Sequence, residues 1–194
     1  MNTIASQPSS SLLSLEEKNK AAHYLASTRD NVIHAVTGLS DSQWDFKPAP
    51  DRWSVAEIVE HIALVENRVH AIIDAMPSAP AAERDRIDSQ VDELILTQVP
   101  QRLTKVPAGP QVSPSRQWSP LEALKRFSDN RDQTFELLAS APSLRGHVVP
   151  HPILGPWDGY QWILAAAAHS ARHTEQILEV KGDAGFPDAH SATS

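Results

Sequence analysis

The chain has 194 residues, of which 41% are hydrophobic, and a formal charge of −7 from 17 basic and 24 acidic side chains. This length and composition are typical of one globular domain with a sizeable core, and the lack of clustered lysine and arginine argues against nucleic-acid binding. The chain contains no cysteine, which excludes a disulfide framework, a thiolate metal site and a cysteine nucleophile.

Four long windows contain none of the 15 prolines, namely residues 15–39, 54–76, 121–141 and 158–181. Because an interior proline costs an α-helix about 3 kcal/mol, each window predicts a helix. Each helix begins with a capping signature, in which a short polar residue precedes a glutamate or glutamine by three positions. These signatures are Ser14 with Glu17, Ser54 with Glu57, Ser119 with Glu122, and Asp158 with Gln161.

The ends and connections of these helices complete the predicted fold. Helix ends are expected at Gly38, Pro77, Pro142 and Gly182. No alternating pattern is long enough to predict a strand. The second and third helices are joined by the proline-rich residues 77–118, which leave room for a short helix near 82–97. We therefore expect an all-α protein, a four-helix bundle with a long crossover connection between helices two and three.

The fourth helix contains the most informative motif, His169 and His173 in the sequence HSARH. Residues four apart share one face of a helix, with Cβ atoms about 5–6 Å apart, so both imidazoles can reach one metal ion. The same face contains apolar residues, all within about 80° of His169 in projection: Trp162, Ala165, Ala166, Ile177 and Val180. The pair therefore points into the protein, where imidazoles need polar partners.

His61 is the natural third ligand, because it lies among apolar residues on one face of the second helix. Three inward histidines on two helices favour a metal site over three separate hydrogen-bonded core histidines, and both interpretations stay open. His151, in the loop before the fourth helix, is either at the mouth of the site or in solvent. The remaining histidines are expected at the surface, with His70 pointing away from His61: His23, His34, His70, His147 and His190.

Two further side chains lie near the predicted ligands. Glu57, one turn before His61, is either an outer contact of the site or the helix cap. Gln176, one turn after His173, can hydrogen-bond an outer imidazole nitrogen or pack as a core glutamine. Ser170 follows the first histidine of the pair, where a zincin protease has its glutamate base, so protease chemistry of that kind is disfavoured.

Two stretches, residues 47–61 (KPAPDRWSVAEIVEH) and 151–177 (HPILGPWDGYQWILAAAAHSARHTEQI), resemble the DinB-like (DinB/YfiT) superfamily. The family pattern is a tryptophan-serine helix start leading to one histidine, followed by a final helix with HxxxH and a glutamine. The resemblance covers most of residues 14–181. It implies a single DinB-like helical domain over residues 1–194, with frayed tails at 1–11 and 185–194, and one divalent metal on His61, His169 and His173.

The resemblance also implies a range of activities. Members of the family include thiol-dependent transferases and an isomerase that use a low-molecular-weight thiol, others are labelled metal-dependent hydrolases, and homodimers are common. Imidazole ligands suit zinc, nickel, iron or copper. We expect a metal-dependent transferase that acts on a small electrophile with such a thiol; the alternatives are a metal-dependent hydrolase and a non-catalytic protein that binds a metal or small ligand.

The sequence gives fewer indications of the cellular location and the substrate of the protein. The first residues contain no basic stretch before an apolar run, and nowhere do 18 consecutive apolar residues occur, so we expect a cytoplasmic protein without a membrane segment. Small-molecule specificity is expected to come from residues 77–118 and 142–157. The substrate and the identity of the metal do not follow from these patterns.

Overall fold

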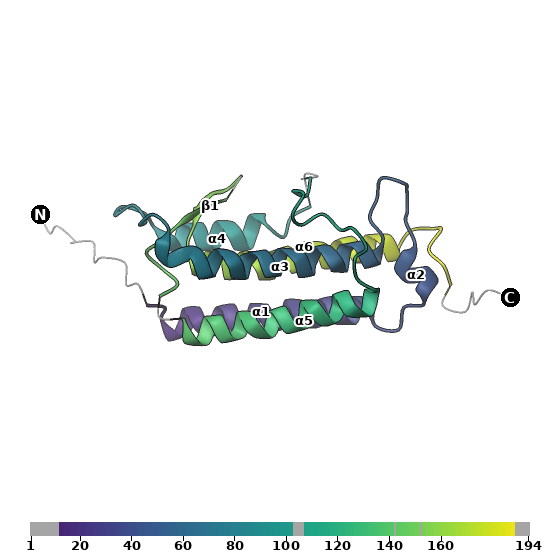
Figure 1. Ribbon diagram of the computed structural model, residues 1–194, viewed down its shortest axis with the longest axis horizontal. Helices are drawn as coiled ribbons and strands as arrows, with labels where there is room; N and C mark the ends of the chain where they lie inside the picture. The colour runs from purple at the N-terminus through teal and green to yellow at the C-terminus, as the bar shows by residue number, and fades with distance from the viewer. Residues whose placement is uncertain (1–11, 103–106, 142, 152, 189–194) are drawn as a thin grey trace, which may run out of the picture.

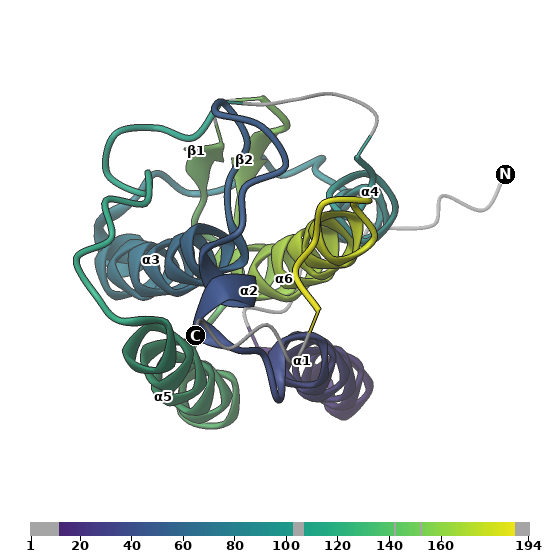
Figure 2. The same ribbon diagram turned by 90° about the vertical axis from the view of Figure 1, so that its right-hand side faces the viewer.

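The computed structural model describes residues 12–102, 107–141, 143–151 and 153–188, and it confirms the four-helix bundle (Figure 1). The long helices are α1 (Leu15–Val36), α3 (Val55–Ala75), α5 (Pro120–Ser140) and α6 (Gly159–Lys181). Figure 2 shows α3 and α6 in one layer and α1 and α5 in the other. Within the described ranges, no helix has the length and hydropathy that crossing a bilayer requires.

The long connection acts as a crossover, as expected. It leaves the end of α3, returns along the bundle and enters α5 at the opposite end, so that these two neighbouring helices run parallel (Figure 1). α1 and α6 run in the other direction. α3 packs on both α5 and α6, and this double contact determines which of its side chains are buried.

The four predicted helix starts are confirmed. Ser14, Ser54 and Asp158 each form a reciprocal capping box with the residue three positions later, and Ser119 accepts a hydrogen bond from the N–H of Glu122. Gly182 caps the end of α6. Gly38 lies just beyond α1 with φ of 77°, in the left-handed region that glycine adopts without strain.

Shorter elements fill the connections. They are α2 (Asp41–Asp45), the 3₁₀ turn η1 (Met76–Ser78), α4 (Asp88–Gln98), β1 (Val149–His151) and β2 (Gly155–Trp157). The helix expected near 82–97 begins later, at Asp88, because Ala81 and Ala82 pair with the backbone of residues 146–147 instead. β1 and β2 form an antiparallel hairpin that the sequence did not predict, because three residues a strand are too few to show an alternating pattern.

An ion pair lies in the middle of the bundle core, at a polar interruption of the apolar pattern of α5. Arg131 donates from Nε to Glu66 Oε1 at 2.6 Å, and both side chains are at most 2% exposed. The same guanidinium donates to the Leu25 carbonyl at 2.7 Å and to Ser170 Oγ at 2.9 Å. Arg131 therefore connects α5 to α3, α1 and α6.

His70 corrects one of the predictions. It was expected in solvent, but it is buried and its Nε2 lies 2.8 Å from Thr134 Oγ1 of α5. The reason is that α5 covers the side of α3 opposite His61, so α3 has two buried faces. His147, also expected at the surface, is half-buried, and its Nδ1 donates to the carbonyl of Ala79 at 2.7 Å.

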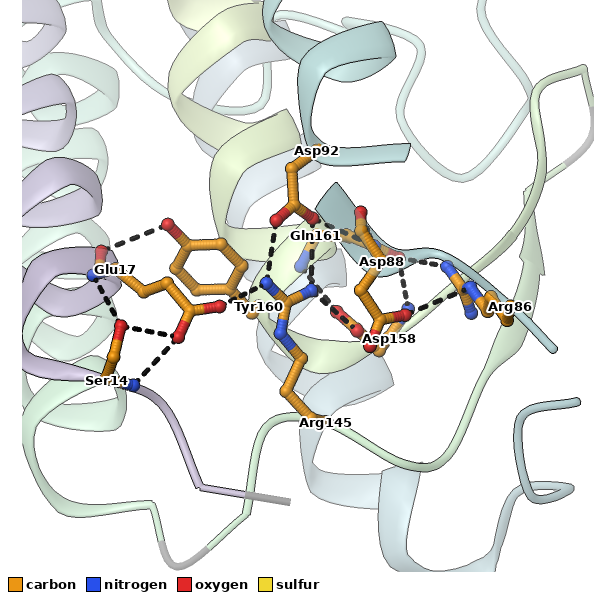
Figure 3. Close-up of polar contacts among 9 residues, drawn as sticks. All are labelled: Ser14, Glu17, Arg86, Asp88, Asp92, Arg145, Asp158, Tyr160 and Gln161. Carbon is orange, nitrogen blue, oxygen red and sulfur yellow. Dashed lines mark hydrogen bonds and ion pairs between the residues drawn. The ribbon is translucent and has the colours of Figure 1, made fainter. Parts of the chain in front are cut away.

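A second charged network, around Arg145, ties α4 to one end of the bundle (Figure 3). Arg145 lies before β1 and donates to Glu17 of α1 at 2.6 Å, to Asp92 of α4 at 2.7 Å and to Asp158 at 2.9 Å. Gln161 of α6 donates to Asp92 at 2.9 Å. These contacts add to the apolar packing of α4, in which Ile95 is fully buried in the core that α6 lines.

The chain beyond α6 folds back onto α2. The ring of Phe186 packs edge-on against Phe46 with centroids 5.5 Å apart, and Gln43 donates to the Pro187 carbonyl at 2.9 Å. The tail is expected to fray from residue 185, but these contacts pack Phe186 and Pro187 against the region of α2. Pro142, His190 and the tails at 1–11 and 189–194 lie outside the described residues.

Candidate metal centre

The structure brings His61 of α3 together with His169 and His173 of α6. The Nε2 atom of His169 lies 3.2 Å from that of His61 and 3.1 Å from that of His173. One nitrogen from each ring lies within 4.8 Å of the other two. Among the described residues, this is the one group of three or more possible metal ligands that lie this close together. His61 and His169 are 108 residues apart, so the packing of α3 on α6 creates the cluster.

Two of the rings are held by hydrogen bonds from their other nitrogen. His61 Nδ1 donates to the backbone carbonyl of Val112 at 2.6 Å, and His173 Nδ1 donates to Gln176 Oε1 at 2.9 Å. Because both acceptors are amide oxygens, the proton belongs on Nδ1 and the lone pair on Nε2. Such contacts orient metal-binding histidines and raise their basicity.

Burial keeps these imidazoles neutral. It lowers the pKa of His61, and it lowers the pKa values of His169 and His173 well below the ordinary 6.5, with the neighbouring histidines as a further cause. His61 and His173 both direct an Nε2 lone pair at Nε2 of His169, which carries at most one proton, so a cation between the rings would satisfy all three nitrogens. The donor set therefore fits a divalent metal, with nitrogen ligands of the kind that zinc, nickel and iron accept.

Glu57 is directed away from this cluster. Its Oε2 accepts a hydrogen bond from the Ser54 N–H at 2.8 Å, and its Oε1 pairs with Lys47 at 2.7 Å. Its carboxylate therefore serves the start of α3. His151 lies on β1, where its ring stacks on Trp157 with centroids 3.9 Å apart, and it lines the cleft that leads to the cluster. Burial lowers its pKa.

Glu60 supports the histidine cluster indirectly, a role that the sequence did not predict. Its buried carboxylate accepts hydrogen bonds at 3.2, 2.8 and 3.2 Å from three consecutive backbone N–H groups, those of Ser115, Arg116 and Gln117. Arg116 has φ of 59°, the left-handed conformation that lets the N–H groups converge. This anchor holds the loop that presents the Val112 carbonyl to His61. Nothing in the sequence marks a glutamate beside a histidine as a loop anchor.

The three histidines lie at one side of a cleft of about 1210 Å³. Trp53 forms part of its wall, with its ring centroid 4.8 Å from that of His61 and 6.3 Å from that of His173. Trp162 and Val65 add apolar surface, while several arginines line the same space. The cleft is large enough for a small molecule whose reacting group lies at the histidines.

Comparison with known proteins gives a consistent set of matches. The family model for the DinB superfamily matches residues 24–177. The uncharacterized protein YuaE of Bacillus subtilis is 27% identical over 152 residues, which are 75% of this chain and 88% of that protein. The structure of YfiT from Bacillus subtilis, described as a probable metal-dependent hydrolase with an unusual four-helix bundle topology, aligns with a TM-score of 0.60 and 16% identity, covering 94% of this chain and 95% of that one. At that identity the likeness to YfiT concerns the fold.

Proposed function

Because the chain belongs to the DinB superfamily, we propose that it is a metal-dependent enzyme whose single divalent ion binds His61, His169 and His173. The observation that carries the proposal is the convergence of one nitrogen from each ring within 4.8 Å. Three protein ligands are typical of catalytic rather than structural sites, because coordination positions remain for a reactant.

We propose further that the reaction is the transfer of a low-molecular-weight thiol to a small electrophile. The two carboxylates nearest to His61 along α3 support this choice, since Glu57 caps the helix and Glu60 anchors a loop. Neither is placed to act as a general base for an attacking water. A thiol is itself the nucleophile, and it needs no such base if its own pKa is lowered enough for the thiolate to form.

The chain's own residues have definable roles in this reaction. Bound between the histidines, a divalent ion would supply Lewis acidity that lowers the pKa of the nucleophile. The rings of His61 and His173 are kept in the required tautomer by Val112 and Gln176. Trp53 limits water at one side of the cleft. A bond forms between sulfur and the electrophilic carbon, the leaving group departs with its electron pair, and the thiol proton passes to solvent.

The proposal is tested with the full-length protein, stripped by a chelator and then loaded with one equivalent of Zn²⁺, Ni²⁺ or Fe²⁺. Glutathione or cysteine is supplied with 1-chloro-2,4-dinitrobenzene, and thioether formation is followed by absorbance. We expect metal-dependent turnover that falls at least about 100-fold in His169→Ala and His173→Ala. His23→Ala, at an exposed position of α1, is the matched control. Turnover that is equal in the metal-free protein and in these variants rejects the proposal.

A metal-dependent hydrolase is the second candidate, and the description of YfiT is the observation that favours it. The two reactions differ in their nucleophile. A hydrolase cleaves p-nitrophenyl esters with no thiol present, whereas the transferase needs the thiol for every turnover. Stoichiometric metal with no turnover in either assay would instead indicate a non-catalytic metal-binding protein.

A further inference from the structure

Four arginines line the cleft beside the histidines: Arg52, Arg68, Arg102 and Arg172. Among the described residues of the lining, the carboxylates are those of Asp51 and Glu179, so four positive and two negative charges leave an excess of +2 there. The whole chain has a formal charge of −7. The described lining of the cleft is therefore more positive than the chain as a whole.

Two of these arginines lie on the same helices as the histidines, so the helix geometry fixes their distance from them. Arg172 lies between His169 and His173 on α6 and is only partly exposed. Arg68 follows His61 by seven residues, which returns it to the same side of α3 about 10 Å farther along the axis. A ligand that contacts both a histidine and one of these arginines therefore spans about 5–10 Å, the size of a small organic molecule.

The negative charge available to the arginines is limited. Arg102 forms a two-pronged ion pair with Glu179, at 2.9 Å for both contacts, and Arg52 shares the same carboxylate at 3.6 Å. Glu179 is itself about half exposed, at 48%. Arg68 is hydrogen-bonded to the neutral side chain of Gln111. One exposed carboxylate thus serves two guanidinium groups.

Arg172 adds a second positive group close to Arg102. The charges of Arg172 and Arg102 repel each other, and the Glu179 carboxylate offsets part of this repulsion. The half-exposed carboxylate of Glu179 therefore acts on three guanidinium groups, and a bound anion would add negative charge beside them. Guanidinium groups are also the side chains best shaped to bind a carboxylate or phosphate through two parallel hydrogen bonds.

We propose that these arginines form an anion-binding subsite, which holds the carboxylate or phosphate of a small acidic reactant while its reacting group lies at the histidines. The placement of the reacting group rests on the function proposed above. The binding of the anion does not, because the guanidinium groups need no metal. The subsite makes acidic molecules the preferred reactants and makes their affinity fall with salt.

The test uses metal-free and metal-loaded full-length protein, with succinate as the probe and neutral succinamide as its matched control. Calorimetric titration at low salt is expected to give at least about tenfold tighter binding of succinate than of succinamide to both forms. We expect Arg68→Gln and Arg172→Gln each to weaken succinate binding at least fivefold and Arg172→Lys to weaken it less. Arg126→Gln, an exposed arginine of α5 paired with Glu122, should leave it unchanged.

The outcomes separate this inference from the proposed function. Equal binding of succinate and succinamide, or succinate binding that is unchanged in Arg68→Gln and Arg172→Gln, overturns the subsite. Succinate binding that occurs only in the metal-loaded protein also overturns it, since the metal would then be the binding group. Arginine-dependent binding in a protein that takes up no metal supports the subsite and rejects the metal-dependent enzyme. Circular dichroism of each variant verifies that it is folded.

Discussion

Replacing Arg131 by methionine is expected to destabilise the protein strongly. The guanidinium makes five hydrogen bonds within the core, two of them to Glu66, and the arginine itself is fully buried. Its loss leaves the Glu66 carboxylate buried without its cation, which typically costs about 3–5 kcal/mol. Because small proteins are stable by about 5–15 kcal/mol, this is a large fraction of the total free energy of unfolding.

Urea unfolding followed by tryptophan fluorescence and by circular dichroism measures this loss, since the chain has five tryptophans. The double variant Glu66→Leu with Arg131→Met removes both charges and should recover much of the stability, which gives a favourable coupling energy of at least about 2 kcal/mol. Lys125→Met, which breaks an exposed pair with Asp129, should change stability by less than about 0.5 kcal/mol.

The reasoning would be refuted by two results. One is a cost below about 1 kcal/mol for Arg131→Met, because a buried unpaired carboxylate cannot be that inexpensive. The other is additive behaviour of the two single variants, which would mean that the two charges do not depend on each other. A change in the slope of unfolding against urea would have to be excluded first, since it indicates an altered unfolded or native state.

Three further predictions concern protonation and the supports of the histidine cluster. Burial lowers the pKa of His70 below 6.5, so the unfolded chain binds more protons as pH falls below that value and stability declines there. His70→Gln should remove up to about 1.4 kcal/mol per pH unit of that slope in urea titrations between pH 5 and 7, whereas His23→Gln, at an exposed site, should not. Gln176→Leu should weaken Zn²⁺ binding about 10–100-fold in a chelator competition assay, and an affinity within twofold of wild type would contradict its supporting role. Glu60→Ala frees the loop that presents Val112 and should weaken Zn²⁺ binding by a similar factor, with Glu60→Gln intermediate; equal affinities in all three proteins would exclude the loop anchor.

Local signals in the chain specify much of the bundle. Proline-free windows and caps such as Ser54 with Glu57 predict the four long helices, because helix starts depend on hydrogen bonds between residues three apart. The orientation of His169 and His173 follows from helical periodicity in the same way. The apolar face around His61 predicts it as their partner, and the family pattern agrees. The crossover follows from the length of the segment between the second and third helices.

Other features depend on contacts between distant parts of the chain. His70 is buried because α5 covers a second face of α3, and Arg131 reaches Glu66 across 65 residues. The hairpin before α6 has too few residues to show a pattern, and the loop held by Glu60 gives no periodic signal at all. A single sequence records which side chains share a helix face, since that is local geometry. It does not record which helix will cover that face, because this depends on the free energy of packing the whole bundle.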